Sequence, residues 1–134
     1  MNTMKKTLLY AAILATIGFI ECAPQYRQET YLVDYRPYQK DGFTITPSSS
    51  GFVYESLGNI YIVFVDGVKK GYTNPNPQYP YQQNMFIHTY ELMVSEMVKK
   101  AKELGANALL NFQIIQDTEN PRAYIASGFA VKLK

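Results

Sequence analysis

The sequence contains a single cysteine, Cys22, and its position predicts acylation. It follows a positive start at Lys5 and Lys6 and an uncharged apolar stretch from Thr7 to Ile20. A basic start followed by such a stretch is typical of a secretory signal peptide. As a helix, these 14 residues would span about 21 Å. Because a bilayer core is roughly 30 Å thick, a retained transmembrane helix is the weaker interpretation.

Cleavage immediately before Cys22 explains this arrangement best. Ordinary signal peptidase requires small residues one and three positions before the cut, and a cut after Ala23 would place Glu21 at the second of these. A cut before Cys22 resembles the bacterial lipobox, in which the cysteine thiol takes the lipid, although Glu21 replaces the usual small residue. Two or more acyl chains hold a protein stably on a membrane.

We therefore expect residues 1–21 to be a lipoprotein signal peptide and Cys22 to carry palmitate or a related acyl chain. The lipid anchor would hold the mature protein on a bacterial membrane of the cell envelope, the outer membrane in our prediction. The alternative is an incidental cysteine beside a cleaved signal.

Few other side chains could perform chemistry. Zinc and copper sites need several cysteine or histidine ligands, but His88 is the only histidine and is explained as a helix residue. Asp66 and Glu91 could meet in space, although nothing in their spacing requires it. We find no Ser/His/Asp set and no phosphate-binding glycine loop. The sequence therefore predicts no catalytic residues, no metal site and no cofactor.

Nucleic acid is also not an expected partner. The net charge is only +2, and the basic residues form no stripe.

Tyrosine is unusually abundant, with 12 copies and no tryptophan. Residues 71–84 contain three prolines and three asparagines and have no hydrophobic period, which predicts a loop. Long loops are usually functional or disordered. Tyr72, Tyr79 and Tyr81 lie in this loop, and a tyrosine ring with its polar tip suits an interface. We expect these three residues to contact a partner; the alternative is that the tyrosines cover the edges of a small sheet.

A helix from Met85 to Leu104 should follow this loop. Its apolar residues recur three and four positions apart and form one stripe: Phe86, Tyr90, Val94, Met97, Val98, Ala101 and Leu104. Asn84 can cap the first turn, and Gly105 stands where a left-handed C-terminal cap is expected.

Five segments have the alternating or continuous apolar character of strands: residues 42–47, 52–57, 59–65, 108–115 and 124–133. The segment 59–65, NIYIVFV, is apolar on both faces and is typical of a central strand. Gly58 predicts a break before it, and Asp66–Gly67 predicts a turn after it. The last strand carries small residues on one face, which invites close packing by a helix or by another backbone. These residues are Ala126, Gly128 and Ala130.

This order of elements predicts an α+β domain over residues 42–134. One main amphipathic helix should pack on a small, mainly antiparallel sheet. One pair of strands flanking the helix is expected to run parallel through a right-handed crossover. The polar, aromatic residues 22–41 predict a tether, with a short strand at Tyr31–Asp34.

The segment Ala101–Ile114, AKELGANALLNFQI, resembles the hallmark of the YbjQ-like family, often labelled heavy-metal-binding domains. In that family a helix ends in a Gly-Ala-Asn-Ala segment that enters a strand, and a small-residue strand closes the domain. The counterparts are Gly105, Ala106, Asn107 and Ala108, and then Gly128 to Val131, with Phe129 in place of the usual threonine. The resemblance covers Phe52 to Leu133. It implies a YbjQ-like fold, self-association into homo-oligomers, and the metal or small-ligand binding of the family label.

The same helix-to-strand passage is similar to that of the RcsF-like lipoproteins, lipid-anchored stress sensors of the outer membrane. Their fold is held by disulfides, which a chain with one cysteine cannot form internally. For Gly105 and Asn107 we favour a folding role over ligand binding. Gly105 would end the helix, and Asn107 would either bond backbone groups in the bend or adopt a left-handed conformation itself.

Together these features predict a non-catalytic, lipid-anchored cell-envelope protein that binds another protein or self-associates. The alternative is an envelope protein that binds a small ligand or a metal.

Overall fold

The computed structural model describes residues 26, 28, 30 and 32–134. The chain divides into two units, residues 1–32 and Val33–Lys134, and every element below belongs to the second. The predicted signal peptide and Cys22 lie outside the described residues. Within the described part of the chain, no helix is long and apolar enough to cross a membrane.

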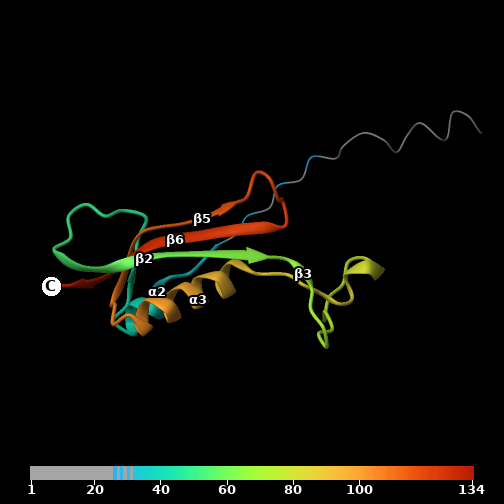
Figure 1. Cartoon of the computed structure of the whole chain (residues 1–134), viewed down its shortest axis with the longest axis horizontal. Helices are drawn as coiled ribbons and strands as arrows, with labels where there is room; N and C mark the ends of the chain where they lie inside the picture. Colours follow the sequence, from blue (N-terminus) through green and yellow to red (C-terminus); the bar gives the residue numbers. More distant parts are fainter. Residues whose placement is uncertain (1–25, 27, 29, 31) are drawn as a thin grey trace, which may run out of the picture. The chain divides into compact units, whose positions relative to one another are not determined.

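The second unit is an α+β fold, as predicted (Figure 1). Its main sheet has the strand order β1-β5-β6-β2, and β3 and β4 form a separate two-stranded sheet. The elements are α2 (Arg36–Lys40), β1 (Thr44–Ile45), β2 (Tyr54–Val65), β3 (Gly67–Val68), the 3-10 helix η1 (Pro80–Gln82), β4 (Met85–Phe86), α3 (Tyr90–Glu103), β5 (Ala108–Gln116) and β6 (Ala123–Leu133).

The main sheet is mostly antiparallel. β6 pairs antiparallel with both β2 and β5, whereas β1 runs parallel to β5. The sequence predicts that a pair of strands flanking α3 runs parallel. In the main sheet, the nearest strands before and after α3 in the chain are β2 and β5, and these two do not pair. β6 lies between them and separates them.

Helix α3 covers one face of the sheet (Figure 1). It buries an apolar stripe consisting of Met93, Val94, Met97, Val98 and Ala101. Ala126 and Ala130 of β6 are fully buried in the same core. The prediction that the small-residue face of this strand receives a helix is confirmed, since short side chains leave room for it.

Helix α3 is shorter at its start than predicted. It begins after Thr89, whose Oγ1 accepts a backbone N–H of the first turn at 3.2 Å. Met85 and Phe86 instead pair with β3 as strand β4. The predicted start at Met85 and the predicted cap at Asn84 are therefore wrong, because pairing with a distant strand overrides the helical spacing of these residues.

Strand β2 corrects two predictions. It continues through Gly58, because a bulge at Leu57 lets Ser56 face Val131 and Gly58 face Ala130. The apolar segment 59–65 is also not central, since β2 is the outer strand of the sheet. Tyr61, Val63 and Val65 of this strand are also exposed on the face away from α3.

Residues 33–41, which the sequence assigns to the tether, pack with the compact unit. Arg36–Lys40 forms helix α2, with Pro37 in its first turn. Val33, Tyr35 and Tyr38 pack against the core. No strand forms at 32–34, the described part of the segment 31–34. The sequence does not predict this packing, because polar residues separate the three apolar side chains and the segment shows no clear hydrophobic period.

Candidate functional site

The tyrosine-rich segment 71–84 is a loop between β3 and β4 that is held by its own polar groups. The backbone N–H of Asn74 donates to Gln83 O at 2.7 Å, and Lys69 N donates to Asn84 O at 3.0 Å. The Gln82 side-chain oxygen accepts the backbone N–H of Gln78 at 2.9 Å. These bonds hold the backbone of the loop at several points along its length.

Two of the three predicted contact residues meet at the end of this loop. The rings of Tyr79 and Tyr81 stack with centroids 5.6 Å apart and planes 5° apart. They remain 55% and 68% exposed. Pro80 lies between them at the start of η1. We call these three residues the tyrosine tip; it offers a large aromatic surface that is already held in one arrangement.

Tyr72 does not join the tyrosine tip. Its ring packs edge-on against Phe86 at 5.1 Å, and Lys69 Nζ lies 4.5 Å from the centre of the Phe86 ring. Tyr72 is half-buried. It therefore anchors the base of the loop, and only Tyr79 and Tyr81 are presented at the surface as a pair.

The histidine is engaged in a contact that the sequence does not reveal. Asp66 Oδ1 accepts the backbone N–H of His88 at 2.8 Å and lies 2.9 Å from His88 Nδ1. The two side chains are 14% and 18% exposed, respectively. The His88 ring also packs against Phe64 and Phe86, with centroids 5.2 and 5.0 Å away. Asp66 thus joins the end of β2 to the approach to α3.

Among the described residues, no group of three or more histidine, cysteine, aspartate or glutamate side chains is placed to hold a metal ion. His88 and Asp66, which could contribute two ligands, already contact each other. We therefore assign this pair a positioning role in the fold.

The predicted motif residues lie in a structural turn. Gly105 has φ of 82°, and its N–H donates to Lys102 O at 2.9 Å. The next N–H, from Ala106, reaches back to Ala101 O at 3.0 Å. This pair of bonds is the Schellman arrangement that closes a helix. Ala108 then begins β5 and is fully buried.

Asn107 ties this turn to two strands. Its Oδ1 accepts the backbone N–H of Leu133 at 2.7 Å. Its own N–H donates to Val131 O, and its carbonyl accepts from Thr44 N, each at 3.0 Å. The sequence predicts a side-chain bond to backbone groups in the bend itself; the bond that forms instead reaches Leu133, 26 residues away at the end of β6.

Gly128 lies where β5 and β6 approach closely. A Cβ at this position would be 3.3 Å from Leu109 Cδ2 and 3.5 Å from Leu110 O. The five motif residues therefore shape the sheet, and the tyrosine tip is the candidate site for contact with a partner.

Comparison with known proteins identifies no relative. No family model matches the chain, and no curated protein or solved structure is significantly similar to it.

Proposed function

We propose that this chain is a non-catalytic, lipid-anchored protein of the bacterial cell envelope that acts by binding another protein through its tyrosine tip. The observation that carries the proposal is the stacked pair of Tyr79 and Tyr81, which is exposed on an internally bonded loop. Tyrosine is among the residues that contribute most to binding at protein interfaces.

The fixed geometry of the tyrosine tip favours binding. Ordering a flexible side chain at an interface costs about 0.5–1.5 kcal/mol. Stacking on a 3-10 turn restricts both rings before a partner arrives, so less of this cost falls on association. The loop also contains Asn74, Asn76 and Asn84, and antibody loops likewise combine tyrosine with asparagine.

The partner in this proposal is an envelope protein or a second copy of the chain. The YbjQ-like resemblance supports self-association, and the RcsF-like resemblance supports anchoring through Cys22 at the outer membrane. Anchoring would confine the tyrosine tip to the membrane surface and raise its effective concentration toward partners held there.

Photo-crosslinking in native membranes tests the binding surface. A photoreactive residue is placed at Tyr79 or Tyr81, with Ile115, which is 50% exposed on β5, as a matched exposed control. We expect a specific adduct, heterologous or homotypic, from the two tip positions and little from Ile115. Equal yields at all three positions would show that the tip is no preferred contact.

The anchor has its own test. Mass spectrometry of the membrane fraction should find acylated Cys22 at the mature N-terminus, and Cys22→Ala should release the chain from the membrane. A mature chain that begins at another residue would contradict lipidation.

A further inference from the structure

The outer edge of β2 has no partner in the described part of the chain. β2 is the last strand of the sheet and pairs only with β6. No other backbone hydrogen bond to Tyr54–Val65 is present among the described residues. In an antiparallel ladder, alternate residues direct their N–H and C=O groups away from the partner strand. β2 therefore presents a row of unpaired backbone groups.

After Gly58, this edge also lacks the usual protection against strand pairing. Natural edge strands are shortened, bulged, charged or interrupted by proline. β2 has one charged residue, Glu55, no proline and no lysine, and its bulge at Leu57 leaves seven uncharged residues after Gly58. The opposite edge is protected, because β1 has two residues and α2 packs beside it. The β2 edge is thus able to pair with a further strand.

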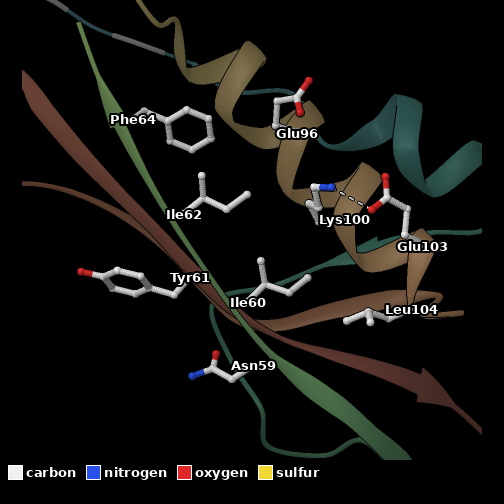
Figure 2. A pocket seen from close by; sticks show the side chains of 9 residues that line it. All are labelled: Asn59, Ile60, Tyr61, Ile62, Phe64, Glu96, Lys100, Glu103 and Leu104. Carbon is white, nitrogen blue, oxygen red and sulfur yellow. Dashed lines mark hydrogen bonds and ion pairs between the residues drawn. The ribbon is translucent and has the colours of Figure 1, made fainter.

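A groove runs beside this edge, between β2 and α3, with a volume of about 520 Å³. Figure 2 shows Ile60, Ile62 and Phe64 of β2 directed toward the helix, while Tyr61 points away. We call the groove and its lining the β2 groove: Asn59, Ile60, Tyr61, Ile62, Phe64, Glu96, Lys100, Glu103 and Leu104. A strand added to β2 would direct every second side chain into it.

The helical wall of the β2 groove is acidic overall. Lys100 Nζ contacts Glu103 Oε2 at 2.9 Å, and this hydrogen bond lowers the pKa of Glu103. Glu96 makes no hydrogen bond or salt bridge within the described residues, although its negative charge also helps to raise the pKa of Lys100. The wall therefore complements a basic side chain beside Glu96.

The same charges disfavour a second copy of β2 as the occupant. α3 runs antiparallel to β2, because Leu104 lies beside Gly58 while His88, just before the helix, packs on Phe64. Two-fold pairing of two β2 strands would bring two α3 helices together antiparallel. In a register that centres the two-fold axis on Lys100, Glu96 of each copy would approach Glu103 of the other, and the two Lys100 side chains would meet.

We propose that the β2 groove binds an extended segment of a partner protein, which adds to the main sheet as a fifth strand. The segment would place apolar residues at alternate positions in the groove and a lysine or arginine beside Glu96. Main-chain bonds supply affinity in such strand addition, and the pockets for alternate side chains supply specificity. This surface shares no residue with the tyrosine tip, so the inference goes beyond the function proposed above and does not depend on it.

A random 12-residue peptide library displayed on phage is the probe, selected against the full chain in detergent. We expect enriched peptides to alternate apolar residues and to contain lysine or arginine. Synthetic versions should slow amide hydrogen exchange at alternate residues of 59–65. No enrichment, enrichment without this pattern, or protection elsewhere would overturn the inference. A peptide-free dimer with these amides already protected would identify a second copy as the occupant instead.

Matched variants localise the binding. Glu96→Lys should weaken an enriched peptide about ten-fold, the scale of a lost charge pair, whereas Glu119→Lys, on an exposed turn, should not change its affinity. Leu104→Glu and Ile115→Glu form a second pair, with parent residues 51% and 50% exposed. Only Leu104→Glu should weaken binding. Equal effects within either pair would contradict a site in the β2 groove.

Discussion

The helix-to-strand turn at Gly105–Ala108 and the loop that carries the tyrosine tip are both held by side-chain amides, but with opposite results. Asn107 bonds the backbone of Leu133 and joins the turn to the end of β6. In the loop, the Gln82 side chain bonds the nearby Gln78, and the Asn74 side chain bonds the backbone of Gln82. The amide of the turn connects distant parts of the chain, whereas those of the loop order one short segment.

The surroundings of the two regions differ accordingly. Ala106 and Ala108 in the turn are buried, whereas Tyr79 and Tyr81 in the loop are more than half exposed. The fixed geometry of the turn therefore stabilises the sheet. The fixed geometry of the tyrosine tip holds an exposed surface in one arrangement for binding. Substitutions in the turn and at Gly128 should reduce stability, and those at the tip should reduce binding alone.

Gly128→Val should have the largest effect on stability. Its added carbons would crowd Leu109 Cδ2 and the Leu110 carbonyl, and the backbone oxygen cannot easily move away. We expect the free energy of unfolding, measured with urea, to fall by about 3 kcal/mol, the upper end for overpacking. Ser127→Val on the other face of β6 is the control and should change it by less than about 0.5 kcal/mol. Equal losses would show that the close approach at Gly128 is unimportant.

Asn107→Ala should follow, with a loss of about 2 kcal/mol, because the partly buried N–H of Leu133 loses its acceptor. Asn107→Asp keeps an oxygen acceptor and should lose less. Urea unfolding of the two variants side by side measures the difference. If Asp were as damaging as Ala, the hydrogen bond would not explain the role of this residue.

Gly105→Ala should cost about 1 kcal/mol, because a Cβ disfavours the left-handed conformation that Gly105 adopts with φ of 82°. Gly67→Ala is the matched control, since Gly67 has no positive φ and its Cβ would meet open space. The control should show no loss in thermal or urea unfolding. A similar loss in both variants would contradict the conformational explanation.

The double change Tyr79→Ser, Tyr81→Ser should have the smallest effect on stability, less than about 0.5 kcal/mol, because both rings are exposed. It should nevertheless abolish the crosslinked adduct from a photoreactive residue at Gln83. Tyr72→Ser is the contrasting variant: it should lose about 1 kcal/mol with the Phe86 contact and retain the adduct. A loss of stability in the double variant would show that the tyrosine tip supports the fold, as the Gly105–Ala108 turn does.

The well-predicted parts of the fold have local signals. The apolar stripe predicts the buried face of α3, and Gly105 marks its end, because both depend on neighbours within a few residues. The start of α3 and the outer position of β2 depend on pairing between distant segments. The segment NIYIVFV has the composition of a central strand, but its own residues do not determine whether other strands pair on one side of it or on both.

In the candidate site, too, features with local signals are predictable from the sequence and features that depend on distant contacts are not. Proline, asparagine and tyrosine predict an exposed loop at 71–84, but the stacking of Tyr79 on Tyr81 requires the turn geometry of η1. Tyr72 separates from this pair because Phe86 enters β4 and not a helix. The contact between Asp66 and His88 joins residues 22 positions apart, beyond the reach of local patterns.

The most direct test of the central claim is photo-crosslinking from position 81 in intact cells, compared between the Cys22 chain and Cys22→Ala at equal amounts of each chain. The account predicts a discrete protein adduct in the Cys22 chain and its loss in Cys22→Ala, with the free energy of unfolding unchanged. The same adduct in both chains would contradict an anchored mode of action. No adduct in either chain would contradict binding through the tyrosine tip.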